Sequence, residues 1–219
     1  MLVLPTFAAP LELHSKRCVL RQWNASDLAP WAAMNADPEV RRHFPSLLSA
    51  EQASAEAGRC RDAIAQRGWG MWALEVPGEF AFAGFVGLNV PHYDAPFVPA
   101  VEIGWRLPRA AWGQGYATEA AQAALEFALT RLGLDEVIAI AVPGNEASLR
   151  VMKRLGMERD EAGDFDHPRV EAGHPLRRHV LYRAVRKGLR AGGNVRQHAV
   201  QPAPAQSRPL PRNGDAHEG

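Results

Sequence analysis

The spacing of hydrophobic and polar residues switches along the chain between a period of two and a period near 3.6, which predicts strands interspersed with helices. Strands are predicted at 18–23, 70–76, 81–90, 101–107, 137–142 and 179–183. Helices are predicted at 26–36, from 37 onward, and at 49–67, 117–132 and 146–155. The order β-α-α-α-β-β-β-α-β-α-β-β predicts an α/β fold in which one mixed sheet carries helices on its faces.

Local signals support two of these boundaries. Ser49 and Gln52 have the spacing of a capping box at the start of a predicted helix. Pro77-Gly78 separates two neighbouring predicted strands, which predicts an antiparallel hairpin.

The composition is that of one ordinary globular domain with a polar tail. Of 219 residues, 47% are hydrophobic and 22% are charged, which excludes collagen-like, disulfide-scaffold and wholly disordered chains. We expect an N-terminal extension at 1–10, a folded domain at 11–187 and a disordered tail at 188–219. The tail is rich in Gly and Pro and poor in large apolar residues, so it buries too little surface to offset its backbone entropy.

Charge and cysteine content restrict the partners and the compartment. The formal net charge is +1, so the chain lacks the basic surplus of non-specific nucleic-acid binding. No apolar run approaches the length of a membrane span. Cys18 and Cys60 fit neither a disulfide framework nor a metal-ligand spacing, which predicts a reducing compartment and a cytoplasmic protein.

The segment Trp112-Gly-Gln-Gly-Tyr-Ala-Thr-Glu-Ala120 lies between the predicted strand 101–107 and an amphipathic helix. Gly113 and Gly115 allow a tight turn whose bare N–H groups can approach a ligand. The helix start adds unpaired N–H donors and the positive end of the helix dipole. This arrangement favours a site for a phosphate or pyrophosphate. The alternative is a helix entry that binds no ligand.

Two common phosphate motifs do not fit this segment. A P-loop requires Lys and then Ser or Thr after the second glycine, where this chain has Tyr116 and Ala117. A dinucleotide-binding fingerprint requires Gly or Ala where the chain has Thr118. It also requires an acidic residue at the end of the following strand, whereas Glu136 precedes that strand.

The same segment resembles the acetyl-CoA-binding motif of the GNAT N-acetyltransferases, in the branch that includes the ribosomal-protein N-terminal acetyltransferases. Val101-Glu-Ile-Gly-Trp-Arg-Leu107 resembles the family's fourth strand, and 145–157 resembles its second coenzyme motif. Leu20-Arg-Gln-Trp23 and Met34-Asn-Ala-Asp-Pro-Glu-Val40 are similar to the start of the branch. The resemblance covers about 11–187. It implies a GNAT fold, with a mostly antiparallel sheet, splayed strands 4 and 5, and helices on both faces.

The resemblance implies transfer of an acetyl group from acetyl-CoA, the co-substrate, to an amine without a metal. It places the coenzyme-binding residues in the glycine turn, at the end of the fourth strand and at the start of the later helix. These residues are Gly113, Gln114, Gly115, Tyr116, Ala117, Thr118, Trp105, Arg106, Leu107, Asn145 and Ser148. Trp112 stands where the family usually has Gln or Arg, and its ring would pack under the turn.

The resemblance implies two catalytic candidates. Glu102 matches a position where several relatives have a general base; alternatively, Glu102 pairs with an arginine such as Arg21 or faces solvent. Ser148 would bond to the coenzyme sulfur, or else to the backbone of its own helix. Met152 stands where many relatives have the tyrosine that protonates the thiolate, so the acid is not identified.

The implied acceptor is a primary amine of a protein N-terminus or a small molecule, which attacks directly in a ternary complex on a monomer or homodimer. The alternative is an acyl-CoA-binding module without catalysis, which Met152 permits. His167 and His174 lie in a loop that would border the acceptor pocket, and their spacing matches no zinc motif. Neither nucleic acid nor a membrane is an expected partner.

Overall fold

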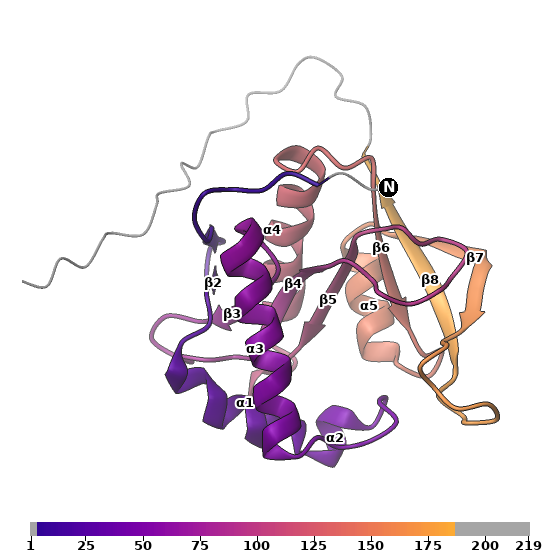
Figure 1. Ribbon diagram of the computed structural model, residues 1–219, viewed down its shortest axis with the longest axis horizontal. Coiled ribbons are helices and arrows are strands. Elements are labelled where there is room, and N and C mark those ends of the chain that lie inside the picture. The colour runs from indigo at the N-terminus through magenta and orange to yellow at the C-terminus, as the bar shows by residue number, and fades with distance from the viewer. Residues whose placement is uncertain (1–3, 187–219) are drawn as a thin grey trace, which may run out of the picture.

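The structure is a computed structural model that describes residues 4–186 (Figure 1). The predicted tail at 188–219 and the first three residues of the predicted extension lie outside this range. The strands are β1 (Leu13–His14), β2 (Val19–Arg21), β3 (Met71–Glu75), β4 (Phe85–Asn89), β5 (Glu102–Arg106), β6 (Glu136–Ala141), β7 (Glu158–Asp166) and β8 (Arg178–Val185). The helices are α1 (Leu28–Asn35), α2 (Pro38–Arg41), α3 (Ala50–Arg67), α4 (Tyr116–Thr130) and α5 (Glu146–Arg154).

The strands form one sheet in the order β1-β2-β3-β4-β5-β6-β8-β7. All neighbours in it are antiparallel except β5 and β6, which run parallel. A single residue pair, Glu102 with Ile138, is in register between these two strands. Ile138 N donates to Val101 O there at 2.9 Å, and the strands separate beyond it. The predicted mostly antiparallel sheet with two splayed central strands is therefore confirmed.

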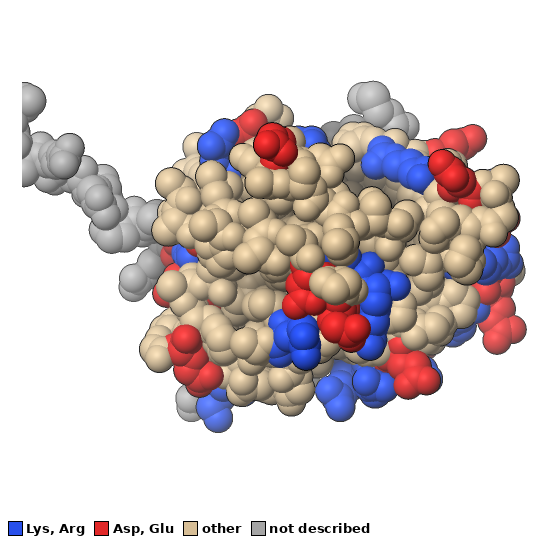
Figure 2. Space-filling model, turned by 90° about the horizontal axis from the view of Figure 1, so that it is seen from below, with Lys and Arg blue, Asp and Glu red and all other residues tan. Residues whose placement is uncertain are grey.

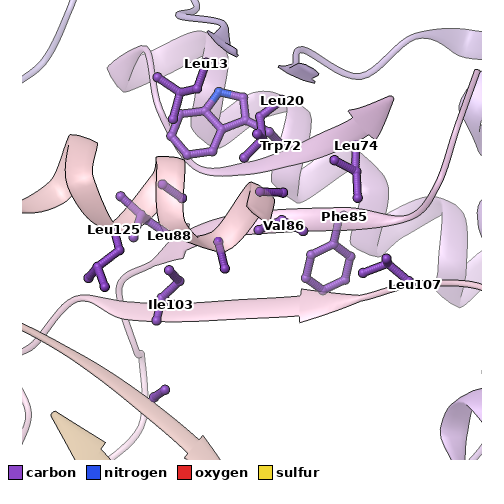
Figure 3. Close-up of a cluster of buried hydrophobic side chains, with 14 of the residues drawn as sticks. Leu13, Leu20, Trp72, Leu74, Phe85, Val86, Leu88, Ile103, Leu107 and Leu125 are labelled. Carbon is purple, nitrogen blue, oxygen red and sulfur yellow. The ribbon is translucent and has the colours of Figure 1, made fainter. Parts of the chain in front are cut away.

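Helices cover both faces of the sheet. On one face, the ring of Trp72 in β3 meets Phe127 of α4 edge-on, with centroids 5.8 Å apart. On the opposite face, Phe85 of β4 packs against Trp31 of α1 at 5.0 Å, and α3 lies in front of β3 (Figure 1). The core on the α4 side is apolar. There the buried side chains of Leu88, Ile103 and Leu125 lie close together (Figure 3).

Helix boundaries follow the capping signals closely. Ser49 N donates to Gln52 Oε1 at 2.8 Å, and Gln52 N donates to Ser49 Oγ at 3.2 Å, so the capping box of α3 is formed. The helix ends at Gly68, which has φ +84°. The helix predicted from 26 begins at Leu28 instead, because a 3₁₀ turn precedes it and Asp27 turns inward to a salt bridge with Arg21.

Strand boundaries differ more from the prediction. The predicted hairpin is antiparallel as expected, but its second strand begins at Phe85 and not at 81. A closed turn accounts for this difference, because Val76 N donates to Phe80 O at 2.8 Å. The two-residue β1 and the polar β7 were given no predicted range. β7 is stabilised by pairing with β8 and by charged contacts such as the one between Arg183 Nε and Asp160 Oδ2 at 2.6 Å.

Candidate active site

The glycine turn connects the end of β5 to the start of α4. Gly113 and Gly115 have φ of +75° and +84°, a region that residues with a side chain rarely adopt. No side chain among the described residues caps this helix, and its first bonded amide is that of Glu119, which donates to Gly115 O. The amides at 116–118 are therefore without helical partners. An anion is a suitable partner for them because the helix dipole is positive at this end.

The side chains of the turn point away from this group of amides. Tyr116 is buried, and its hydroxyl donates to Glu79 Oε2 at 2.6 Å, so only its backbone is available to a ligand. Trp112 was predicted to pack under the turn, and it does not. Its ring is 41% exposed, and its Nε1 donates to Leu107 O at 2.7 Å.

Arg17 lies over the glycine turn and is not among the predicted residues. Its Nε donates to Glu119 Oε2 at 2.7 Å, and its Nη1 donates to Gln114 O at 3.1 Å. The guanidinium also lies 4.7 Å from the centre of the Tyr116 ring. Arg17 therefore places a guanidinium over the turn, with its charge paired by the Glu119 carboxylate. An isolated arginine far upstream of the motif carries no sequence signal for this position.

The three predicted residues at the end of β5 have different surroundings. Backbone groups of a strand point alternately to its two neighbours, and Val101 O bonds to β6. The backbone of Trp105 therefore points to the same side, where β6 has separated. Arg106 is paired with Phe85 of β4, and the carbonyl of Leu107 is taken by Trp112. Of the three, Trp105 faces the gap between β5 and β6.

The start of α5 brings two predicted residues to the same gap. Asn145 caps the helix, with its Oδ1 accepting from Ser148 N at 3.2 Å. The hydroxyl of Ser148 has no hydrogen bond to any residue within 4–186, so the alternative backbone bond from its side chain is not formed. Met152 is buried one turn further along the helix, and its thioether cannot donate a proton.

One cleft of about 1120 Å³ joins these elements. Every predicted site residue lines it except Gln114. A smaller hollow of about 560 Å³ lies beside it, over the start of α4, and shares Gly115, Thr118 and Arg154 with the cleft. Arg154 is therefore near both cavities, whereas Lys153 lines neither.

Glu102 is a carboxylate in this cleft without a cationic partner among residues 4–186. Arg21, its predicted alternative partner, instead pairs with Asp27 at 2.8 Å and Glu75 at 2.6 Å. The hydroxyl of Tyr93 donates to Glu102 Oε2 at 3.4 Å. Burial raises the pKa of Glu102 to about 7, against which the Tyr93 hydrogen bond acts in the lowering direction. A carboxylate with this pKa can exchange a proton near neutral pH.

Tyr93 belongs to the segment between β4 and β5 and packs against the β7–β8 hairpin. Its ring stacks on Phe165 with centroids 6.1 Å apart, and it lies 4.6 Å from His167. Burial lowers the pKa of His167 to about 4 and also lowers that of His179, so both imidazoles are neutral at neutral pH. His167 and His179 line the cleft, whereas His174 does not.

The described residues form neither a metal site nor a membrane-spanning helix. No group of His, Cys, Asp and Glu side chains within 4–186 is placed to hold a metal ion. In the same range, no helix has both the length and the apolar character needed to cross a bilayer.

The arrangement of glycine turn, splayed strands and cleft agrees with a family comparison. Residues 17–158 match the family model described as an acetyltransferase (GNAT) domain. The chain belongs to the GNAT acetyltransferase family. The family prediction is therefore confirmed.

Relatives and solved structures of GNAT proteins resemble the chain over most of its length. It is 34% identical over 178 residues to the FsC-acetyl coenzyme A-N(2)-transacetylase of Aspergillus fumigatus, covering 77% of this chain and 75% of the relative. It is 28% identical over 151 residues to a Bacillus subtilis protein called "Uncharacterized N-acetyltransferase YnaD", covering 68% of this chain and 84% of the relative.

Two solved GNAT-like structures share the fold. A GNAT-family acetyltransferase from Bacillus anthracis superposes with a TM-score of 0.67 at 22% identity, covering 80% of this chain and 99% of the other. Mycobacterium smegmatis RimJ, solved in complex with CoA-disulfide, superposes with a TM-score of 0.60 at 21% identity, covering 81% and 86%.

Proposed function

We propose that this GNAT protein transfers an acetyl group from acetyl-CoA to the primary amine of a peptide N-terminus or a small molecule, by direct attack in a ternary complex. The observation that carries the proposal is the single cleft that joins the glycine turn, the gap beside β5, and Glu102. The name of the Aspergillus relative, which states acetyl transfer from coenzyme A to an N(2) nitrogen, supports the same reaction class. A cytoplasmic location is also a proposal, and rests on two cysteines that remain separate thiols.

In this proposal the chain's backbone holds the coenzyme. The amides of the glycine turn, 113–118, bind the pyrophosphate at the positive end of α4. Arg154 adds positive charge beside that anion, and the guanidinium of Arg17, paired with Glu119, lies over the turn. The backbone of Trp105, which faces the gap between β5 and β6, binds the pantetheine arm and polarises the thioester carbonyl.

The transfer step needs a base for the acceptor and an acid for the thiolate. Glu102 accepts the proton that the acceptor ammonium releases, and the free amine then attacks the thioester carbonyl carbon. The new C–N bond forms and the C–S bond breaks, the attacking nitrogen gives up its second proton to solvent, and the CoA thiolate leaves. The hydroxyl of Ser148, which is free of other hydrogen bonds within the described range, donates a hydrogen bond to the sulfur, and solvent supplies the proton.

A second candidate function is an acyl-CoA-binding module without catalysis. The specific observation in its favour is Met152, which is buried and lines the cleft where a proton donor would be needed.

An assay of thiol release distinguishes the two functions. Purified protein is mixed with acetyl-CoA and a panel of primary amines, and CoA release is compared with the rate in buffer alone. We expect release that depends on the amine. Tight binding of acetyl-CoA with no release above the buffer rate for any amine would favour the binding module instead.

A further inference from the structure

One face of α3 forms a wall of the cleft. Glu56, Arg59, Cys60, Ala63 and Arg67 line the cleft, and their spacing places them on a single side of the helix. The wall lies on the sheet face opposite α4, whose N-terminus forms the glycine turn. The proposed coenzyme position is on the α4 side, so the α3 wall borders the part of the cleft that is available to the acceptor.

Arg106 extends this wall from the sheet. Its Nη1 donates to Asn35 Oδ1 at 2.7 Å and contacts Glu56 Oε2 at 3.2 Å. The Arg106 side chain is only 9% exposed, and its buried Nε has no hydrogen-bond partner among the described residues. The guanidinium is therefore held in place by two contacts, but one of its N–H donors has no hydrogen-bond acceptor among the described residues.

Positive charge on this wall exceeds the negative charge that faces it. Glu56 is paired with Arg106. Arg59 and Arg67 have no carboxylate within 4.0 Å in the part of the chain that the structure describes, and burial lowers the pKa of both Arg67 and Arg106. On the face shown in Figure 2, Lys and Arg lie close to Asp and Glu. A cleft lined by one sign of charge attracts ligands of the opposite sign.

The floor between Glu102 and Arg106 is open. Glu102, Gly104 and Arg106 are alternate residues of β5 and so share one face of the strand. At the usual rise of a strand, the Cα atoms of Glu102 and Arg106 lie about 13 Å apart. A methyl group at Gly104 would have one heavy atom within 4 Å, the flexible Cε of Met71. An acceptor can therefore lie along this face with its amine at Glu102 and its other end at the arginines.

We propose that the α3 wall binds a carboxylate of the acceptor, so that the acceptor is an amine that also carries an acidic group, as in an amino acid or an acidic peptide. This inference rests on the proposed acetyl transfer. Arginine suits the role because its planar group of donors matches the geometry of a carboxylate. A polyamine would instead place a second positive charge beside Arg59 and Arg106, which disfavours it.

Two acceptors that differ at one end test the proposal. 6-Aminohexanoate and 1,6-diaminohexane present the same amine on the same chain, and end in a carboxylate or in a second ammonium. We expect kcat/KM for the aminohexanoate to be at least about tenfold higher at low ionic strength, with the ratio narrowing in added salt. Peptides that share one N-terminal residue and continue with three Asp or three Lys show whether a peptide carboxylate serves as well.

A pair of variants on one helix locates the effect. Arg59→Gln should reduce the preference for the carboxylate several-fold and leave KM for acetyl-CoA unchanged. Arg61→Gln is the control, because Arg61 is exposed, pairs with Asp62 and does not line the cleft. Equal rates for the two acceptors, or an Arg59→Gln effect confined to acetyl-CoA, would overturn the proposal.

Calorimetry separates this inference from the proposed reaction. Binding of each acceptor is measured with CoA present, which requires no turnover. Preferential binding of the aminohexanoate without any transfer would contradict the proposed reaction and support the carboxylate site. Transfer to both acceptors with equal affinities would support the reaction and contradict the carboxylate site.

Discussion

At the scale of single residues, the surroundings of a charged side chain determine its role. Arg21 is buried, but two carboxylates and two backbone carbonyls compensate its charge, so it stabilises the packing of β2. Glu102 is a partly buried carboxylate that, within residues 4–186, has one weak hydrogen bond and no cationic partner. A group in this environment is available for proton transfer, and at the start of β5, where the gap to β6 begins, it is the strongest base candidate in the cleft.

Glu102→Gln tests the base directly. Without a carboxylate to accept the ammonium proton, kcat/KM for the amine should fall by about 10²- to 10⁴-fold at neutral pH. The deficit should narrow at high pH, where the amine is already deprotonated. Rates are measured between pH 6 and 10, and Glu158→Gln, at an exposed position, is the control. A pH profile of Glu102→Gln that matches the wild type would exclude Glu102 as the base.

Tyr93→Phe tests the environment of the base. The phenol lowers the pKa of Glu102 by hydrogen bonding to it, so its removal should raise that pKa above about 7. The acidic limb of kcat/KM should therefore move to higher pH, and the loss of rate should be larger at pH 7 than at pH 9. Tyr182→Phe is a matched control, because no residue within 4–186 hydrogen-bonds its hydroxyl. An identical limb in wild type and Tyr93→Phe would contradict this positioning role.

At the scale of elements, the turn before α4 combines two backbone requirements in six residues, 113–118. Gly113 and Gly115 have positive φ, and the amides after them start a helix that no side chain caps among the described residues. The turn was predictable because all of its residues are contiguous in the sequence. The environments of Trp105, Arg106 and Leu107 were not, because they depend on which neighbour each backbone group of β5 faces.

Gly115→Glu and Gly133→Glu form a matched pair on the two ends of α4. Both positions have positive φ, +84° and +69°, so the backbone strain is similar, and both variants add one negative charge. We expect Gly115→Glu to abolish acetyl-CoA binding in calorimetry because its carboxylate competes with the pyrophosphate. Gly133→Glu should bind normally. Retained affinity in Gly115→Glu would place the coenzyme elsewhere.

At the scale of the whole molecule, the sequence predicts what is local and periodic. The long helices, the central apolar strand β6 and the order of elements were all evident from hydrophobic spacing and capping. β1 was not placed because it has only two residues. β7 was not placed because it is polar and forms only by pairing with β8. Arg17, Tyr93 and the arginines of the α3 wall were missed for a related reason. They come from segments far from the motifs and reach the cleft only after the sheet has assembled.

The pH dependence of unfolding gives a test that involves no substrate. Glu102 has a pKa of about 7 in the folded state against 4.5 ordinarily, so the folded protein binds this proton more tightly. The contribution of Glu102 to stability is therefore full below pH 4.5 and is lost as pH rises through about 7, by up to about 3 kcal/mol at about 1.4 kcal/mol per pH unit. Water in the cleft reduces this amount. Glu102→Gln should raise Tm more at pH 8 than at pH 5, and an equal change at both would contradict the raised pKa.

The single register pair between β5 and β6 affects how the molecule can move. Strands β1–β5 and strands β6–β8 each form a continuous set of ladders. The seam between these two sets, which is the boundary between β5 and β6, has a single residue pair in register. Opening the seam breaks little of the backbone bonding that holds the sheet together, so resistance to it comes from side-chain packing, both of α4 against β4, β5 and β6 and of Tyr93 against the β7–β8 hairpin. Helix α4 therefore contacts strands on both sides of the boundary between β5 and β6, and the same helix begins at the glycine turn.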